Sequence, residues 1–347
     1  MPSTIPVAIL THAAGPHLDA YLTALAQCPE ADSVAIADAS ETTFAAARKA
    51  LGEKLKLTGK SAEAVLKEFK PKLALVTMEA VLAPPAIDAA LEQSCHVYAE
   101  KPACVRASDF EPLVRKAEAK HLHLMLALAN RITPASLAAR ELVRSGRLGK
   151  LYGVEIHLVA DQTRLKNEGF RKSWMGQKSR AGGGHFTWLG IHWLDLAMFI
   201  TGASVEQVTG FSGVVGGQPM DVEDSNAAAL RFDNGMFGTM TSGYYLDRGY
   251  HQHIRVWAEK GWLWLCEQTD APLKWQVFGD AKEPGVQSFT KPNEPKGYTP
   301  FVRAAVRAAA GLEEPPITAR EGLRVLDAIF AFYEAAKTGQ TKSLKRG

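Results

Sequence analysis

The sequence predicts an α/β fold in two parts. The first part is a parallel sheet covered by helices, and the second is an α+β part with a large, mostly antiparallel open sheet. Short unbroken apolar runs alternate with helix-like segments over the first third of the chain, which is typical of parallel sheets buried on both faces. From about residue 130, apolar and polar residues alternate instead and glycine-containing turns appear. The chain has 347 residues, more than one core usually serves, so we expect two domains, 1–127 and 128–347.

The elements of the first domain follow one another as strand and helix. We expect strands in 7–10, 33–38, 72–78, 96–102 and 122–131, with helices in 16–26, 41–52, 86–94 and 109–120. Gly52 closes the second helix, since glycine readily adopts the left-handed conformation that ends helices. Repeated units of this kind predict a Rossmann dinucleotide-binding domain.

The second domain opens with a helix in 136–150 and a strand in 151–161. Two hairpins are predicted, one turned at Asn234-Gly235 and one at Lys260-Gly261. A final helix, 319–338, follows a capping Thr318 and stops at Gly339. Packing of this last helix against the first domain is left open.

The composition excludes several classes of protein. Forty basic and 37 acidic residues give a net charge of +3, too weak to indicate a nucleic-acid or membrane partner. The four cysteines are scattered without a CxxC pair, so we expect no disulfide framework, no metal site and a reducing compartment. No apolar run reaches the ~18 residues of a membrane helix, and the amino terminus lacks the pattern of a signal peptide, so we expect a cytoplasmic protein.

The stretch LTHAAGPHLDAYLTAL, residues 10–25, joins the first strand to the first helix. A dinucleotide-binding protein normally has a glycine-rich loop here, because backbone N–H groups must approach the pyrophosphate. Only one glycine remains, and a β-branched threonine cannot cheaply adopt a positive φ. We therefore expect an altered nucleotide loop, whose cofactor-binding candidates are Thr11, His12, Ala13, Ala14 and Gly15.

Asp38 ends the second predicted strand, more than 20 residues after this turn. A carboxylate at that position can bind both ribose hydroxyls of adenosine and repel a 2′-phosphate, which favours NAD over NADP. The alternative is an aspartate that only starts a turn, and the sequence does not separate the two.

Three further stretches carry a resemblance to a known family. In the first, Glu100-Lys101-Pro102 ends a strand and is followed by Asn130-Arg131 and by a helix ending in G-x-x-G-K at 146–150. In the second, three glycines at 182–184 precede G-x-H-x-x-D, which contains His192 and Asp195. The third is the strand pair 222–243. Together they resemble the Gfo/Idh/MocA oxidoreductases, the family of glucose–fructose oxidoreductase and inositol dehydrogenase, over essentially the whole chain.

The resemblance implies NAD-dependent oxidation of a secondary alcohol. The catalytic candidates are Lys101, as the base, and His192, which would donate to the substrate oxygen or relay its proton. A lysine partly buried beside a cationic nicotinamide has the lowered pKa that a base needs. Further cofactor contacts are expected from Thr77, Glu100 and Lys101. The substrate-binding candidates are Lys101, Asn130, Arg131, Trp188, His192 and Asp195.

This chain also departs from the family's pattern. Trp188 takes the place of the aspartate that flanks the reacting hydroxyl in family dehydrogenases, and Met78 and Leu82 replace the usual proline and histidine. An indole can stack on the C–H face of a sugar, but Trp188 can equally be a core residue. Lys101 can be a surface lysine, His192 and Asp195 can be ordinary helix residues, and Arg131 can merely pin an interdomain joint.

The leading hypothesis is therefore an NAD(H)-dependent oxidoreductase acting on a secondary hydroxyl of a sugar, polyol or sugar derivative. One alternative is a non-catalytic sugar- or nucleotide-binding regulatory protein on a degenerate dehydrogenase scaffold, which the missing glycines and Trp188 favour. Another is an NAD-assisted glycoside-cleaving enzyme. As in the family, the open sheet of the second domain is expected to form a homodimer or homotetramer.

Overall fold

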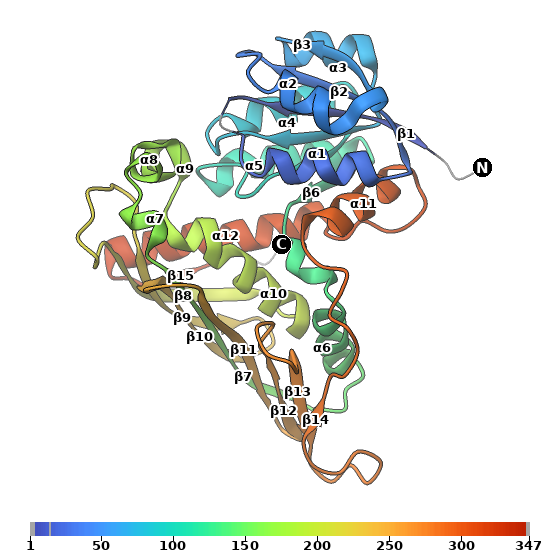
Figure 1. Cartoon of the computed structure of the whole chain (residues 1–347). Helices are drawn as coiled ribbons and strands as arrows, with labels where there is room; N and C mark the ends of the chain where they lie inside the picture. Colours follow the sequence, from blue (N-terminus) through green and yellow to red (C-terminus); the bar gives the residue numbers. More distant parts are fainter. Residues whose placement is uncertain (1–3, 14, 345–347) are drawn as a thin grey trace. The chain divides into compact units, whose positions relative to one another are not determined.

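The computed structural model describes residues 4–13 and 15–344. Its internal contacts divide the chain into two units. The N-terminal unit contains the chain up to Ala129 together with Ser179–Gly182 and Lys296–Leu323, and the C-terminal unit contains the remainder. Figure 1 colours the chain along its sequence and labels its elements.

The N-terminal unit is built on a parallel sheet. Over the described residues this sheet has six strands, in the order β3-β2-β1-β4-β5-β6, and every neighbouring pair is parallel. The strands are β1 (Ile5–Thr11), β2 (Ala31–Asp38), β3 (Leu55–Gly59), β4 (Leu73–Thr77), β5 (His96–Ala99) and β6 (Leu124–Leu126). The central strands are unbroken apolar runs because both of their faces are buried. The predicted parallel Rossmann sheet is confirmed.

Most of the helices of this unit lie between these strands in the sequence. They are α1 (Leu18–Gln27), α2 (Phe44–Leu51), α3 (Ala62–Phe69), α4 (Ala83–Glu92) and α5 (Ala107–Ala119), whereas α11 (Tyr298–Ala309) comes from later in the chain. Helix α1 buries Tyr21, Leu22 and Leu25, which lie on one face at helical spacing, and it packs against α11.

Strand β3 and helices α3 and α11 of this unit were not among the elements predicted. Strand β3 is a short edge strand whose side chains are only partly buried, so it lacks the apolar run that reveals the other strands. The helix that follows it, α3, is capped by Ser61, whose hydroxyl accepts a hydrogen bond from Ala64 N at 3.3 Å. The strand predicted third, 72–78, is therefore the fourth, β4.

The C-terminal unit contains a larger sheet. Where the chain is described, this sheet has nine strands in the order β14-β13-β12-β11-β7-β10-β9-β8-β15. Only β10 and β7 pair in parallel, so the predicted mostly antiparallel sheet is confirmed. The strands are β7 (Leu151–Asp161), β8 (Val205–Gly213), β9 (Ser225–Phe232), β10 (Phe237–Leu246), β11 (Tyr250–Ala258), β12 (Gly261–Leu265), β13 (Leu273–Val277), β14 (Gln287–Ser288) and β15 (Lys342–Ser343). Both predicted hairpins are present, β9–β10 with Gly235 at φ 84° and β11–β12 with Gly261 at its turn.

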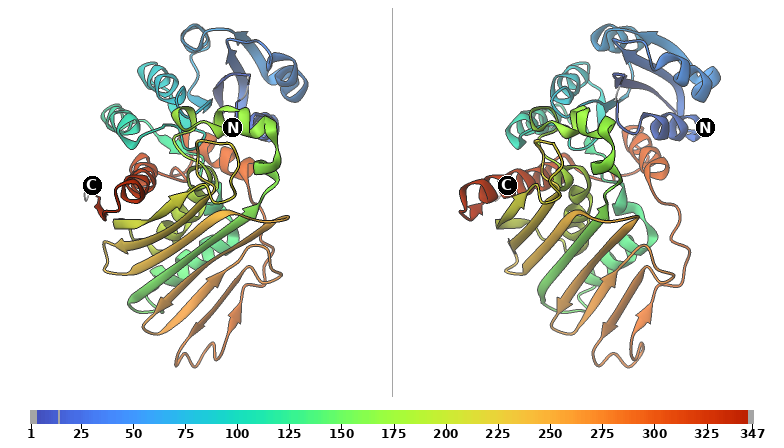
Figure 2. Two further views of the ribbon diagram at one scale, coloured as in Figure 1. Left: turned by 90° about the vertical axis from the view of Figure 1, so that its left-hand side faces the viewer. Right: turned by 60° about the vertical axis from the view of Figure 1, so that its left-hand side comes forward.

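One face of this sheet is covered by helices. The helices on this face are α6 (Pro134–Arg144), α10 (Ile191–Thr201) and most of α12 (Ala319–Thr338). The short helices α7 (Thr163–Lys166) and α8 (Glu168–Lys172) also belong to this unit, whereas most of α9 (Lys178–Ala181) belongs to the N-terminal unit. Helix α10 packs against α6 and β7, and α6 also contacts β12 and β13. No helix of the described residues covers the opposite face of the sheet (Figure 2). Strand β9 accordingly alternates buried and exposed side chains.

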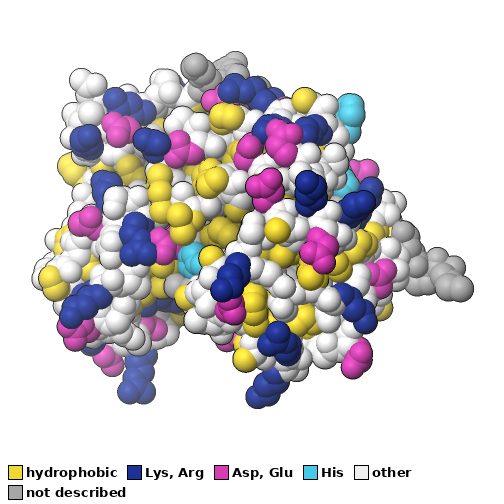
Figure 3. All heavy atoms as spheres, turned by 90° about the horizontal axis from the view of Figure 1, so that it is seen from above, with side chains coloured by type: hydrophobic (Ala, Val, Ile, Leu, Met, Phe, Trp, Pro, Cys, Tyr) yellow, Lys and Arg dark blue, Asp and Glu magenta, His cyan; other side chains and the backbone are white. Residues whose placement is uncertain are grey.

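Basic and acidic side chains are interspersed on the face of the molecule seen in Figure 3. The described residues include no helix with the length and hydropathy needed to span a membrane. They also include no cluster of three or more His, Cys, Asp or Glu side chains placed to bind a metal ion.

Candidate active site

The carboxyl ends of four neighbouring strands bring most of the predicted cofactor-binding residues to one edge of the N-terminal sheet. Thr11 ends β1, Asp38 ends β2, Thr77 ends β4, and Glu100-Lys101 follows β5. In the sheet, β2 lies beside β1 on one side and β4 lies beside β1 on the other, so the strand order reverses at β1. Open α/β sheets bind their ligands outside the carboxyl ends of the strands, at such a reversal of strand order.

The turn from β1 to α1 is held tightly against β4. The Thr11 hydroxyl donates to the Thr77 carbonyl at 3.0 Å, and the Thr77 hydroxyl donates to the Pro16 carbonyl at 2.5 Å. A Cβ atom on Gly15 would lie 2.2 Å from Thr11 Oγ1 and 2.8 Å from the Thr77 carbonyl oxygen. Gly15 is therefore needed for this close approach, while Thr11 and Thr77 use their hydroxyls to hold the turn.

His12 attaches the same turn to the segment after β4. Its Nε2 accepts a hydrogen bond from Glu79 N at 3.0 Å, and the Glu79 carboxylate pairs with Arg180 through Nε at 2.7 Å and through a second, shorter contact. The neighbouring Ala13 is exposed, and Ala14 lies outside the described residues. The part of the turn that follows β1 thus offers backbone groups and small side chains rather than a glycine-rich loop.

The amino end of α1 has the features of an anion site. His17 occupies its N-cap position with φ 58°, and its side chain makes no capping hydrogen bond to the first turn. The first backbone N–H groups of a helix have no intrahelical acceptor, and with the helix dipole they bind phosphate groups. The uncapped end lies next to the strand reversal, so these residues fit the pyrophosphate of a dinucleotide even without the usual glycines.

Asp38 holds the turn after β2. Its carboxylate accepts from the backbone N and the hydroxyl of Ser40, at 2.9 and 2.7 Å, and from those of Thr43, at 3.1 and 2.8 Å. Burial raises the pKa of Asp38, but these hydrogen bonds outweigh it and the net pKa is lowered. The carboxylate is thus ionised and already well supplied with donors. Its turn-forming role is evident, and its role as a ribose ligand stays a prediction.

Lys101 is buried directly after β5, and its peptide bond to Pro102 is cis. Its Nζ lies 3.9 Å from Oε1 of the equally buried Glu100. Tyr21 donates a short hydrogen bond to Oε2 of Glu100, and Nδ1 of His17 lies 3.2 Å from the same oxygen. Lys101 is therefore not a surface lysine of a turn, and its amine belongs to a buried cluster of ionisable groups.

In the C-terminal unit, Gly183 and Gly184 lead into a buried carboxylate. Glu223 accepts hydrogen bonds from Gly184 N at 2.6 Å, Phe186 N at 2.9 Å and the Tyr333 hydroxyl at 2.8 Å. A Cβ on Gly184 would lie 1.9 Å from the Glu223 carbonyl oxygen, so only glycine allows this approach. Sequence reasoning missed Glu223, because a buried carboxylate contacting residues 37 and 39 positions away leaves no local signal.

The glycines are followed by a π-helical turn, Phe186–Gly190, which runs into α10. Such turns are rare and frequent at functional sites. Trp188 lies in this turn, and its ring meets that of Trp174 edge-on, with centroids 5.8 Å apart. His192 follows as the second residue of α10, four positions after Trp188 and partly exposed. The structure thus brings together these two candidates on one helical segment.

Arg131 and Asp195 are both buried and form an ion pair. Asp195 lies on α10, one turn after His192. Arg131 Nε and Nη2 donate to the two carboxylate oxygens of Asp195 at 2.8 and 2.6 Å. The pair joins the short helical segment Ala129–Ile132 to α10. This burial favours a structural role for both residues over direct substrate contact. The neighbouring Asn130 has a buried amide nitrogen for which the described residues provide no hydrogen-bond partner.

Two family models match the chain one after the other. An oxidoreductase family with an NAD-binding Rossmann fold matches residues 14–128, and the GFO/IDH/MocA C-terminal domain matches residues 136–264. The chain belongs to the Gfo/Idh/MocA oxidoreductase family. Its first unit is the family's NAD-binding domain.

Two of the relatives of this Gfo/Idh/MocA chain are enzymes named for sugars. A 26% identical relative is the dTDP-3,4-didehydro-2,6-dideoxy-alpha-D-glucose 3-reductase of Saccharopolyspora spinosa, matched over 74% of this chain and 75% of that enzyme. Levoglucosan dehydrogenase of Pseudarthrobacter phenanthrenivorans is also 26% identical, but the match covers only 44% of each chain. A solved levoglucosan dehydrogenase in complex with NADH and L-sorbose has a similar fold, with a TM-score of 0.84 and 20% identity. The match covers 98% of this chain and 99% of that one.

His185 and its neighbours form a second buried polar group in the Gfo/Idh/MocA C-terminal domain. His185 Nδ1 lies 2.6 Å from the Ser242 hydroxyl, and its ring meets that of Tyr244 edge-on at 4.4 Å. Burial, with a smaller contribution from Arg164, lowers the pKa of His185 to about 3. This histidine is therefore neutral and cannot act as a cation near pH 7.

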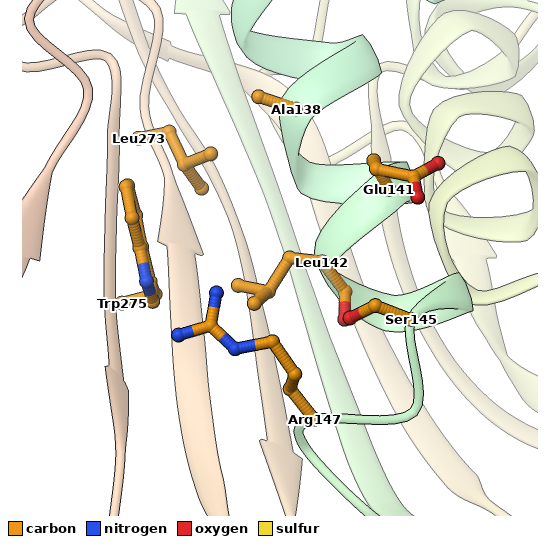
Figure 4. A pocket seen from close by; sticks show the side chains of 7 residues that line it. All are labelled: Ala138, Glu141, Leu142, Ser145, Arg147, Leu273 and Trp275. Atoms are coloured by element: carbon orange, nitrogen blue, oxygen red, sulfur yellow. The ribbon is translucent and has the colours of Figure 1, made fainter. Parts of the chain in front are cut away.

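A cavity of about 260 Å³ lies elsewhere in the same unit, between α6 and β13. Figure 4 shows Leu273 and Trp275 on one side of it and Leu142 and other α6 side chains on the other. The guanidinium of Arg147 at this cavity is paired with Asp280 at 2.8 Å and Glu283 at 2.5 Å. None of the predicted site residues lines this cavity.

Proposed function

We propose that the chain is an NAD(H)-dependent oxidoreductase that moves a hydride between nicotinamide and a secondary hydroxyl of a sugar, polyol or sugar derivative. The observation that carries this proposal is the burial of the Lys101 amine beside Glu100, next to the strand reversal where α1 presents its uncapped amino end. The sugar-directed activities of the relatives support the substrate class.

Each residue then has a defined task. The amino end of α1 and Gly15 would hold the pyrophosphate, and Asp38 would favour NAD over NADP by opposing a 2′-phosphate. Nicotinamide, when bound, supplies the hydride acceptor or donor. Lys101 takes the hydroxyl proton during oxidation and returns one during reduction. His192 donates a hydrogen bond to a substrate hydroxyl, and Trp188 provides an apolar face for the sugar ring.

One observation favours a second candidate, a sugar- or nucleotide-binding regulatory protein. Trp188 stands where the family pattern has an aspartate, and an indole can neither accept a proton at neutral pH nor orient His192 as a carboxylate does. In this function, Lys101 and His192 would bind the ligand without turning it over. Ligand binding without any cofactor reduction would distinguish the regulator from the enzyme.

We also propose that the open face of the C-terminal sheet mediates homodimer or homotetramer formation. The register places Phe211, Phe237 and Trp257 on the same face, and they are 83%, 60% and 47% exposed. Large aromatic side chains exposed together on one face are typical of protein interfaces. Sedimentation analysis of the wild type and of Phe237→Glu tests this proposal, because a charge at the interface would shift the protein towards the monomer.

The function is tested by titrating the purified protein with NADH and NADPH and following the cofactor fluorescence. We expect saturable binding with NADH preferred, followed by NAD⁺ reduction with at least one member of a panel including levoglucosan and myo-inositol. Asp38→Ala should reduce the preference for NADH over NADPH, and Glu53→Ala, at an exposed position of the same unit, is the matched control. If the protein bound neither NADH nor NADPH, the proposal would be overturned.

A further inference from the structure

The Lys101 amine is too buried to release a proton directly to water. Its side chain is 1% exposed, so a proton that it accepts cannot pass directly to bulk water. Oxidation of one alcohol by NAD⁺ yields one ketone, one NADH and one proton, and that proton must leave before the amine can act again. The neighbouring groups therefore determine how Lys101 is reset.

Glu100 and His17 lie near one another beside the Lys101 amine. Oε1 of Glu100 lies 3.9 Å from Nζ of Lys101, and Oε2 of the same carboxylate lies 3.2 Å from Nδ1 of His17. The Glu100 side chain is fully buried, whereas the His17 side chain is 32% exposed. The carboxylate thus lies between a buried amine and a ring that reaches solvent.

We propose that Glu100 and His17 form a proton path between Lys101 and solvent, and this inference rests on the proposed dehydrogenase function. The Lys101 ammonium gives its proton to the Glu100 carboxylate, leaving a neutral amine and a carboxylic acid. The acid passes the proton to Nδ1 of His17 while Nε2 releases its own proton to water. Exchange with water then returns the ring to its starting tautomer. The net step moves one proton from the ammonium to water.

The surroundings of Glu100 suit a path rather than a static ion pair. Tyr21 from α1, Tyr98 from β5 and Tyr298 from α11 lie around it. Burial raises the pKa of all three phenols, and the negative charge of Glu100 raises it further, so they stay neutral and leave Glu100, Lys101 and His17 as the groups that exchange protons. The His17 ring packs on that of Tyr298, with centroids 4.7 Å apart, which holds it in place.

The chain offers a matched control for substituting His17. His17 has φ 58°, and the exposed His121 in the same unit has φ 54°. Asparagine tolerates this left-handed backbone better than most residues, so His17→Asn and His121→Asn impose the same backbone demand and each removes one imidazole. Only the first substitution removes a group next to Glu100.

The path is tested without turnover by measuring the exchange of the Lys101 ammonium protons with water, using NMR of protein with ¹⁵N-labelled lysine. We expect His17→Asn and Glu100→Gln to slow this exchange at least about tenfold and His121→Asn to leave it unchanged. If His17 only held the cluster in place, its removal would have the opposite effect on the exchange rate. The loosened cluster would admit water, and the Lys101 protons would exchange faster. Unchanged or faster exchange in His17→Asn would overturn the path.

A second measurement connects the path to the reaction. With NAD⁺ and whichever of levoglucosan or myo-inositol the wild type oxidises, His17→Asn should lower kcat about tenfold with little effect on KM. Free imidazole should restore part of the lost rate, because it can carry the proton from Glu100. If the wild type binds NADH but His17→Asn leaves kcat unchanged, the path alone is overturned. If the wild type binds neither cofactor, the proposed function is overturned and the path with it.

Discussion

Arg131 and Asp195 form a buried ion pair with two hydrogen bonds, at 2.8 and 2.6 Å, between residues 64 positions apart. Removing one partner from such a pair leaves an uncompensated buried charge. We therefore expect Asp195→Asn to lower the free energy of unfolding by about 3–5 kcal/mol. The double variant Arg131→Met/Asp195→Leu should lose less, because it leaves no buried charge.

Urea unfolding of the wild type, of Asp195→Asn and of the double variant measures this difference. The result would contradict the structural role if Asp195→Asn were as stable as the wild type and only its KM for a sugar were raised. That outcome would instead return Asp195 to the substrate-binding residues.

Gly184 and Gly213 make a pair for testing the contact with Glu223. A Cβ on Gly184 would lie 1.9 Å from a backbone oxygen, whereas one on Gly213 would meet nothing within 4 Å. We expect Gly184→Ala to lower stability by about 1–3 kcal/mol or more, because backbone must move to admit the methyl group. Gly213→Ala should change it little. Thermal unfolding of both variants tests this difference. Equal melting temperatures would rule out the close approach of Gly184 to the backbone of Glu223.

Glu30 provides a pH-dependent contribution to the stability of the N-terminal unit. It accepts hydrogen bonds from Arg303 at 2.9 Å and from Arg307 at 2.8 Å, and these lower its pKa from 4.5 to about 2 against the opposing effect of burial. A carboxyl whose pKa is lowered on folding stabilises the native state above its unfolded pKa. This stability is lost as the pH falls from 4.5 towards 2.

Denaturant midpoints measured between pH 6 and pH 3 for the wild type and Glu30→Gln test this contribution. The stability difference between the two proteins should shrink as the pH falls. Glu53→Gln, at an exposed glutamate of the same unit, should show no such trend. A difference that stays constant with pH would show that Glu30 acts through packing rather than charge.

The sequence was sufficient for the parts of the fold that have a local pattern. Buried strands such as β1 and β4 are unbroken apolar runs, and the Asn234-Gly235 hairpin has a turn that few other residues form. Because parallel strands place their carboxyl ends along one edge, the positions of Thr11, Thr77 and Lys101 follow once the strands are assigned. Strand β3 is only partly buried, so its pattern was too weak to predict.

Contacts between distant segments could not be predicted in the same way. The sequence shows three glycines at 182–184 but not why they are needed, because at Gly184 the requirement comes from the backbone of the distant Glu223. Asp38 and Thr77 are expected to serve the cofactor, and their hydrogen bonds with Thr43 and Pro16 show that they hold the turns after β2 and β1. The sequence pattern places such residues on a strand or in a turn, but it does not show which distant residues they contact.

Lys101 is the residue on which the proposed chemistry depends most directly. Lys101→Met keeps most of the apolar stem in its buried position but removes the proton acceptor. Because a positioned acid–base group contributes about 10²–10⁴-fold, we expect kcat for sugar oxidation to fall by at least about 100-fold. NADH binding should survive, since the proposed pyrophosphate site at the amino end of α1 is untouched. Lys49→Met, at an exposed position on α2, is the control and should keep full activity. Fluorescence titration with NADH and initial rates with NAD⁺ separate the outcomes: retained turnover in Lys101→Met would exclude this amine as the base, because no proton could then have passed through it.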